Sequence, residues 1–252
     1  MWRGIHRDQG ITRACDFYTK RNLWALARLW EETNSIEDER TAKMVRFAIT
    51  GTMQGASRMN RHKPNFTASI LMGTLYVGSF IEEANVLRLL SPRIEKTTQL
   101  AKTIPSEACT SVACLHAGKL DQILADSVDY IFTDPPFGSN IFYGDCSFLW
   151  ESWLQEFTDD SLEAVWNKSR KPSEGGKTLE DYKRLMAESF REMYRVLKPN
   201  RWATVVFSNS DDRVWEAIQD AAHEAGFVIY GGREFDKVQR SFKGIKGEKG
   251  QE

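Results

Sequence analysis

An acid followed by two prolines and a phenylalanine, Asp134-Pro135-Pro136-Phe137, is the stretch of this sequence with the clearest capacity for chemistry. It follows residues 128–133, a run of β-branched and aromatic residues that predicts a buried strand. Proline cannot donate to a sheet ladder, so the strand must stop at Asp134. The sequence therefore predicts a carboxylate at the carboxyl end of a strand, where open α/β sheets place their ligand crevices.

The two prolines decide what this turn can bind. They remove backbone donors beside the Asp134 carboxylate and leave carbonyl oxygens, so we expect a pocket that only accepts hydrogen bonds. Such a pocket fits a nitrogen with two hydrogens, which is an exocyclic amine of adenine or cytosine, or an amide. Asp134 and the Pro135 carbonyl would hold both N–H bonds and free the nitrogen lone pair. Pro136 would hold the turn.

Phe137 offers an apolar face on which a base could stack, commonly worth about 1–3 kcal/mol per base. A base inside a duplex would first have to be flipped out of the helix. The side chains of the motif therefore favour a nucleic-acid base as the substrate.

The elements around the motif alternate between strand and helix. A strand candidate spans 111–116, one or two helical turns span 120–125, and a helix covers 148–157. The clearest helix runs from 179 to 197, and Lys198-Pro199-Asn200 ends it. A buried strand follows at 202–208, then a helix from Ser210 or Asp211 to 225, and another strand from 227. This order predicts a parallel, doubly wound α/β sheet.

The first part of the chain has a different pattern. Thr19 can cap a helix whose apolar residues recur at helical spacing to Trp30, and a second helical pattern ends near Gly51. Residues 68–80 are typical of a strand or hairpin, and 82–99 return to helical spacing with a kink or stop at Pro92. We predict a mainly helical N-terminal region, 1–105, and a catalytic α/β part, 106–252.

The composition and net charge restrict the classes of protein to which this chain can belong. The 252 residues are 41% hydrophobic, which is ample for a core, and the net charge of -1 provides no global field for nucleic acid or membrane. The four cysteines include no C-x-x-C pair, so we expect neither a metal site nor a disulfide framework, but a reducing compartment. Without a signal peptide or a bilayer-spanning apolar run, the expectation is a cytoplasmic protein with no membrane partner.

The motif and its preceding strand resemble the catalytic signature of S-adenosylmethionine-dependent amino-methyltransferases that act on adenine N6 or cytosine N4 of DNA. Two further segments, 17–26 (FYTKRNLWAL) and 190–200 (FREMYRVLKPN), resemble segments of bacterial adenine-specific DNA methylases. The resemblance implies a Rossmann-like methyltransferase fold, S-adenosylmethionine as cofactor and double-stranded DNA as substrate. It also implies direct methyl transfer by a site-specific DNA methyltransferase, in a restriction-modification system or as an orphan enzyme. An acid at the first position of the motif favours adenine.

The sequence departs from the family pattern in the segment that would bind the cofactor. The family holds S-adenosylmethionine with a glycine-rich turn after a first strand, and this sequence has no such turn. We therefore expect a partial or split methyltransferase, with no cofactor-binding residues assigned in this chain. A second polypeptide would then supply the cofactor-binding half.

Two basic clusters are the candidate DNA contacts. One lies in a loop-like segment near Pro64, and the other lies in a polar loop that could overhang the pocket. Such clusters are more often solvated loops, but a duplex substrate needs phosphate contacts. The candidates are Arg58, Arg61, Lys63, Lys168, Arg170 and Lys171.

Several alternatives remain open at this point. Within enzymes, cytosine N4, RNA adenine and protein glutamine are further amine substrates, although the motif of the last two classes usually opens with asparagine. From another class, a catalytically silent fragment or DNA-binding or assembly subunit would explain the missing glycine-rich turn. The simplest alternative is a strand-ending turn without function.

Overall fold

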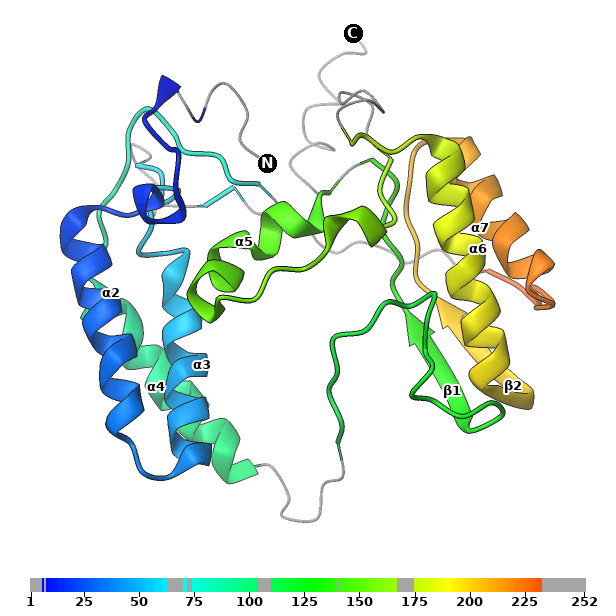
Figure 1. Ribbon diagram of the computed structural model, residues 1–252, viewed down its shortest axis with the longest axis horizontal. Coiled ribbons are helices and arrows are strands. Elements are labelled where there is room, and N and C mark those ends of the chain that lie inside the picture. The colour runs from blue at the N-terminus through cyan, green and yellow to red at the C-terminus, as the bar shows by residue number, and fades with distance from the viewer. Residues whose placement is uncertain are drawn as a thin grey trace, which may run out of the picture.

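The fold described here is a computed structural model of the chain. The structure describes residues 6, 8–62, 70–71, 74–103, 110–139, 141–166 and 175–232. Helices α2, α3 and α4 lie on one side, strands β1 and β2 with helices α6 and α7 lie on the other, and α5 lies between them (Figure 1). In chain order the elements are η1 (Ala14–Phe17), α2 (Lys20–Glu32), η2 (Thr33–Ser35), α3 (Glu39–Met53), α4 (Val86–Thr103), β1 (Val128–Thr133), α5 (Tyr143–Leu154), η3 (Asp160–Leu162), α6 (Leu179–Val196), β2 (Leu197–Val205) and α7 (Asp212–Glu224).

The helix starts follow from capping side chains. Thr19 accepts a hydrogen bond from the Asn22 backbone N–H at the start of α2, as expected from the sequence, and Asp38 does the same for α3. At α6, Thr178 and Asp181 form a reciprocal capping box. Asp211 caps α7, which confirms the second of the two caps proposed for that helix.

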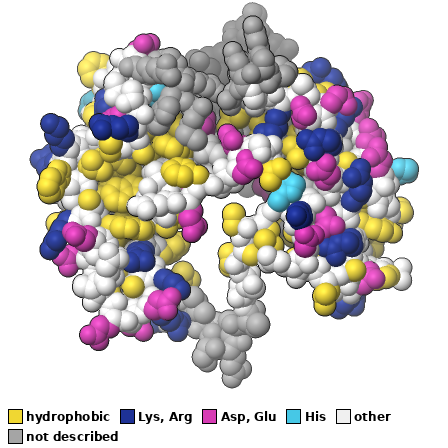
Figure 2. Space-filling model, viewed as in Figure 1, with side chains coloured by type: hydrophobic (Ala, Val, Ile, Leu, Met, Phe, Trp, Pro, Cys, Tyr) yellow, Lys and Arg dark blue, Asp and Glu magenta, His cyan; other side chains and the backbone are white. Residues whose placement is uncertain are grey.

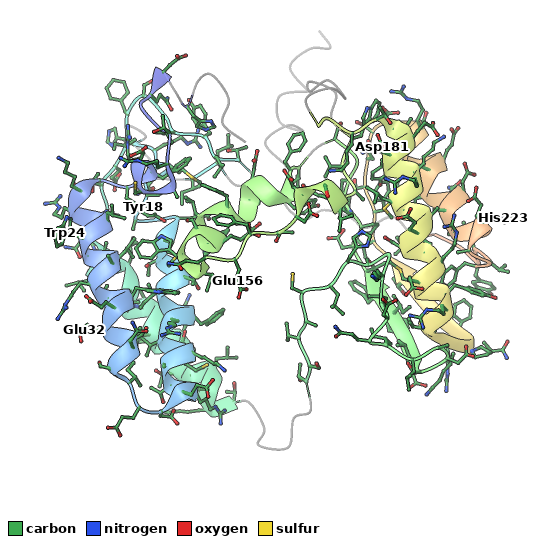
Figure 3. All side chains as sticks on the ribbon, viewed as in Figure 1. Tyr18, Trp24, Glu32, Glu156, Asp181 and His223 are labelled. Carbon is green, nitrogen blue, oxygen red and sulfur yellow. The ribbon has the colours of Figure 1, made fainter. Side chains whose placement is uncertain are left out.

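The helical lobe, α2 to α4, has its own core, which contains Phe17, Leu26, Ile49 and Met53. The same core also contains Phe148 and Leu149 of α5, although α5 follows β1 in the chain. In Figure 3, Tyr18 lies at the start of α2 in this lobe, whereas Asp181 lies at the start of α6 in the other.

The sheet lobe is built from β1, β2, α6 and α7. Tyr182, Phe190, Ala217 and Ile218 of the two helices form a second buried cluster. The space-filling view shows the two lobes joined at the top of the view, with an open notch below the junction (Figure 2). Lys and Arg side chains and Asp and Glu side chains are intermingled over the sheet lobe on this face (Figure 2).

The described sheet has two parallel strands, which confirms a mixed α/β chain with parallel pairing. Ile131 pairs with Ala203 and Thr133 with Val205, and a register shift occurs between Val128 and Tyr130. The doubly wound sheet is not observed within the described ranges. The expected strands at 111–116 and 227–230 are irregular. Neither meets a strand with which to pair, and Val112 and Val228 are about nine-tenths exposed.

The two strands are also less buried than their sequences predict. Tyr130 is 52% exposed, Phe132 67% and Trp202 60%, so one face of the sheet carries uncovered aromatic side chains. An apolar run predicts a strand that is covered on both faces, but here α6 and α7 supply the apolar partners of the sheet lobe. The three rings stay more than half exposed, although Trp202 packs edge-to-face on Tyr230 with 5.6 Å between centroids.

Three boundaries differ from the sequence expectations. Lys198-Pro199-Asn200 lies within β2 instead of separating helix from strand, and Asn200 has a positive φ of 59° at this irregular start. Pro92 lies inside α4 and does not end it, so the expected stop is not observed. The expected strand or hairpin at 68–80 is irregular wherever that segment is described.

Candidate amine-binding site

A cavity of about 560 Å³ opens at the carboxyl end of β1. Thr133, Asp134, Pro135 and Pro136 line one side of it. The other lining residues come from the 114–117 segment, the start of α5, the 158–164 segment and the inner face of α6, and they include Tyr143, Glu163, Leu185 and Met186. The structure therefore places three of the four motif residues at the wall of a cavity large enough for a base (roughly 300–1,000 Å³ is usual for small-molecule sites).

Asp134 and Pro135 retain acceptor capacity. The Asp134 side chain is exposed, and no described residue donates a hydrogen bond to its carboxylate or to the Pro135 carbonyl. Thr133, which precedes them, already accepts the Val206 backbone N–H at 2.9 Å. The first two motif positions can therefore accept N–H bonds from a ligand.

The next two carbonyls are occupied and hold the turn. The Pro136 carbonyl accepts the Tyr182 hydroxyl at 2.9 Å and the Gly138 backbone N–H at 2.9 Å. The Phe137 carbonyl accepts the Asn209 side-chain amide at 2.9 Å. Because α6 and the segment before α7 both bind the turn, its backbone is fixed on two sides, as an organised site requires.

The Phe137 ring is turned toward the protein. It packs edge-to-face on Phe207, with 5.5 Å between ring centroids, and Phe207 packs in the same way on Trp215. Phe137 is not among the described residues that line the cavity. Tyr143, 39% exposed at the first position of α5, is the aromatic side chain that faces the cavity beside Asp134.

Two titratable groups of the cavity are perturbed. Burial raises the pKa of the Glu163 carboxyl above its ordinary value, although that carboxylate accepts the Tyr143 and Gly144 backbone N–H groups at the start of α5. Burial, followed by the Asp134 charge, raises the pKa of the Tyr143 phenol. Both shifted groups border the same cavity as Asp134.

The wall of the cavity is acidic. Asp134, Asp159, Asp160 and Glu163 line it, and no described Lys or Arg does so. Such a wall attracts an amine or a sulfonium cation but offers no cation for the carboxylate of S-adenosylmethionine. Since the sequence also lacks the glycine-rich turn, the described residues fit the amine and do not fit the whole cofactor.

The basic candidates have different locations. Arg58 donates to the Asp16 carbonyl at 2.9 Å and is partly buried, so it joins η1 to the turn after α3. The Arg61 guanidinium lies 5.9 Å from the Tyr76 ring. Neither arginine lines the cavity. Lys63, Lys168, Arg170 and Lys171 lie outside the described residues.

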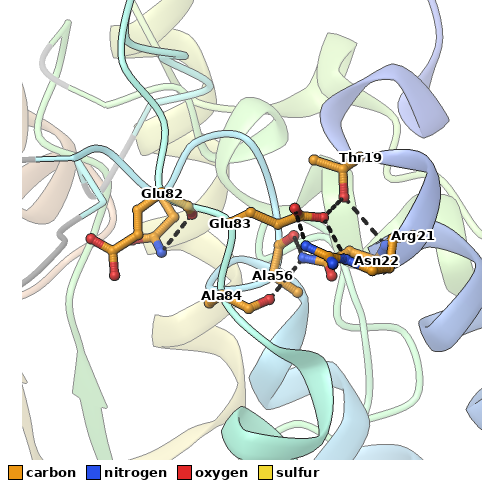
Figure 4. Close-up of polar contacts among 8 residues, drawn as sticks. Thr19, Arg21, Asn22, Ala56, Glu82, Glu83 and Ala84 are labelled. Carbon is orange, nitrogen blue, oxygen red and sulfur yellow. Dashed lines mark hydrogen bonds and ion pairs between the residues drawn. The ribbon is translucent and has the colours of Figure 1, made fainter.

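The segment 17–26 forms a structural junction. The buried Asn22 side-chain amide donates to the Ala56 and Ala84 carbonyls, both at 2.9 Å (Figure 4). Thr19 and Arg21 both bind the Glu83 carboxylate (Figure 4). These contacts join the start of α2 to the segment that enters α4.

Three residues of the site were not anticipated from sequence: Tyr143, Glu163 and Tyr182. The helical apolar stripe of α6 did predict that Tyr182 is buried, but the meeting of its hydroxyl with Pro136 depends on how α6 packs. Tyr143 and Glu163 stand in segments without a clear periodic pattern, so no local signal marked them.

Comparison with protein-family models, with curated proteins and with solved structures finds no match for this chain. Within the described ranges, no helix is both long and apolar enough to cross a membrane, and no group of three or more His, Cys, Asp or Glu side chains could hold a metal ion.

Proposed function

We propose that this chain supplies the target-base pocket of an S-adenosylmethionine-dependent methyltransferase acting on the N6 amine of adenine in double-stranded DNA. The observation that carries the proposal is the pair of unoccupied acceptors, the Asp134 carboxylate and the Pro135 carbonyl, beside a cavity of about 560 Å³. The neighbouring carbonyls of Pro136 and Phe137 are occupied, so the turn is rigid where it must hold an amine.

The roles of the residues follow from this arrangement. Asp134 and the Pro135 carbonyl accept the two N–H bonds of the amine and hold the nitrogen in one orientation. Tyr182 fixes the turn through Pro136. Tyr143 provides an aromatic surface at the cavity for the base. Phe137 supports the turn from the protein side by its contact with Phe207.

We propose that a second polypeptide supplies the cofactor-binding site. Among the described residues the sheet has two strands, which is small for an independent α/β domain, because three or more strands are usually needed for stability. Tyr130, Phe132 and Trp202 leave an aromatic face uncovered. A partner that adds strands at the edges of the sheet and packs helices on this face would complete the sheet and cover these rings.

The experiment titrates the whole chain with nucleosides and measures binding by calorimetry. The acceptor pair should bind 2′-deoxyadenosine about tenfold or more tightly than N6,N6-dimethyl-2′-deoxyadenosine, which has no N–H to donate. Asp134→Asn should weaken 2′-deoxyadenosine binding by a similar factor, because the amide presents donors as well as an acceptor. Asp220→Asn, an exposed change on α7, is the matched control and should leave the affinity unchanged.

Equal binding of the two nucleosides would contradict the acceptor pocket, as would an unchanged affinity after Asp134→Asn. A parallel titration with 2′-deoxycytidine distinguishes adenine from cytosine specificity. In an assembled enzyme, persistence of N6-methylation after Asp134→Ala would contradict the proposed role of Asp134.

The second candidate is a catalytically silent DNA-binding or assembly subunit, which the missing glycine-rich turn favours. A calorimetric titration with S-adenosylmethionine tests whether the chain alone binds the cofactor. Micromolar binding by the chain alone would favour the enzyme and contradict the proposed need for a partner, whereas no binding would agree with that need.

A further inference from the structure

A second cavity, which shares no lining residue with the Asp134 site, lies between α3, α4 and Trp150 of α5. Its volume is about 320 Å³, which falls at the lower end of the usual range for small-molecule sites, roughly 300–1,000 Å³. The three helices supply its wall: Phe47, Ala48, Thr50 and Gly51 from α3, Arg93, Lys96, Thr97 and Leu100 from α4, and Trp150 from α5.

Two cations stand at this cavity without an acidic partner. Arg93 and Lys96 are three residues apart on α4, so their side chains share one face of the helix. Both are exposed, and no ion pair joins either of them to a described acid. Two adjacent cations favour a dianionic group, and a phosphate suits the fork of an arginine.

A threonine hydroxyl adds a polar group to the same wall. Thr97 is 8% exposed and lines the cavity, yet no hydrogen bond to its hydroxyl occurs in the described part of the chain. Other helical threonines bond to a carbonyl of the preceding turn, as Thr103 does to Leu100 at 2.8 Å and Thr52 to Ile49 at 2.7 Å. The Thr97 hydroxyl therefore keeps its donor and its acceptor for a ligand at the cavity.

The remaining wall is apolar and partly aromatic. Phe47 is 61% exposed and Leu100 48%, so both offer free surface to a ligand. The Trp150 indole N–H donates to the Thr50 carbonyl at 2.9 Å, which holds that ring in place. Two aromatic side chains beside two cations match a ligand that carries both a flat ring and a phosphate.

We propose that this cavity binds a nucleotide, with its phosphate on Arg93 and Lys96 and its base against Phe47 and Trp150. Thr97 donates to a phosphate or ribose oxygen. The site is separate from the cavity at Asp134, with which it shares no lining residue, and it does not depend on the proposed methyltransferase function.

The test titrates the whole chain with thymidine 5′-monophosphate by calorimetry. Thymine has no exocyclic amine, so this probe avoids the Asp134 site. We expect saturable binding, and binding at least about tenfold weaker for both thymidine and 2-deoxyribose 5-phosphate, which lack the phosphate and the base respectively. Competition by a 5′-phosphorylated oligonucleotide would identify a nucleic-acid end as the source of the nucleotide, and its absence would identify a free nucleotide.

The variants separate specific contacts from general charge. The double variant Arg93→Gln and Lys96→Gln should weaken binding about tenfold or more, and Thr97→Val should weaken it about threefold to tenfold. The control is Arg88→Gln with Lys102→Gln, which removes two cations from the same helix outside the cavity and should change the affinity less than about twofold. Absence of saturable binding, or equal loss in the double variant and its control, would overturn the proposal.

Discussion

The Tyr182 hydroxyl donates a hydrogen bond of 2.9 Å to the Pro136 carbonyl, which joins the middle of the site turn to the first turn of α6. Tyr182 is fully buried, and burial raises the pKa of its phenol, so the hydroxyl remains a donor over the working pH range. The position of the amine acceptors therefore depends on a helix that does not itself carry them.

Tyr182→Phe removes this hydrogen bond while keeping the ring. Because the Pro136 carbonyl keeps the Gly138 N–H as a donor, we expect a loss of about 0.5–1.5 kcal/mol in the free energy of unfolding, together with weaker 2′-deoxyadenosine binding. Denaturant unfolding and calorimetry measure the two effects. Tyr194→Phe, on the exposed side of the same helix, should change stability by less than about 0.5 kcal/mol. Equal losses in both variants would contradict a role for the bond.

Gly138→Ala tests the space behind the site turn. Gly138 has a φ of 67°, and an added Cβ would meet the Asn209 side-chain amide at 3.1 Å and Val214 at 3.2 Å. Gly10, with a φ of 71° and no atom within 4 Å, is a matched control for backbone strain alone. We expect about 1–2 kcal/mol of destabilisation for Gly10→Ala and a larger loss for Gly138→Ala, measured by denaturant unfolding. Equal losses of stability in the two variants would show that the added Cβ at Gly138 meets no steric barrier.

Glu163→Gln tests the raised carboxyl pKa in the cavity. The fold favours the protonated form, so the stability contributed by Glu163 is present below the ordinary value of 4.5 and is lost as the pH rises through the raised pKa. Glutamine keeps an oxygen for the Tyr143 N–H but does not titrate. Unfolding curves at several pH values should show the wild type losing stability relative to the variant as the pH rises. A relative gain would show that the pKa is lowered instead.

Glu192→Gln should give the opposite pH dependence. Arg195 and the Leu120 backbone N–H lower the pKa of the Glu192 carboxyl from 4.5 to about 2, and Arg195 also donates to the Leu120 and Ile123 carbonyls. The charged form therefore stabilises the connection into β1 above pH 4.5, and this contribution is lost as the pH falls through about 2.

The variant should be less stable than the wild type at pH 7, and the difference should shrink in acid. Glu188→Gln, which removes a surface ion pair with Arg184, should show a smaller difference at pH 7. Acid unfolding curves of the three proteins measure this. A difference independent of pH would exclude the ionised Glu192 carboxylate as its cause.

Local signals in the sequence were sufficient for most helices and for β1. Thr19 and Asp211 are caps whose geometry depends on neighbouring residues only, and the two prolines after Asp134 end β1 for reasons of bonding alone. The predictions of two strands in addition to β1 and β2 were wrong. Residues 111–116 and 227–230 have apolar strand patterns, but neither segment pairs with β1 or β2, and Tyr230 meets Trp202 of β2 through its ring alone.

The site was predictable to a similar extent. The chemistry of Asp134 and Pro135 follows from residue type, and the structure places both at a cavity. The inward packing of Phe137 on Phe207, and the approach of Tyr143 and Glu163 to Asp134, depend on how α5 and the 158–164 segment meet the strand. The sequence gives the order of these segments along the chain but not the distances between their side chains in the fold.

The place of α5 in the chain has a consequence for synthesis on the ribosome. Helices α2 to α4 are complete at Thr103, but their core includes Phe148 and Leu149, which are translated later than all of β1. The nascent helical lobe must therefore wait with part of its apolar surface uncovered until Leu154 has left the exit tunnel. Folding during synthesis cannot proceed lobe by lobe, because the last piece of the first lobe is made in the middle of the second.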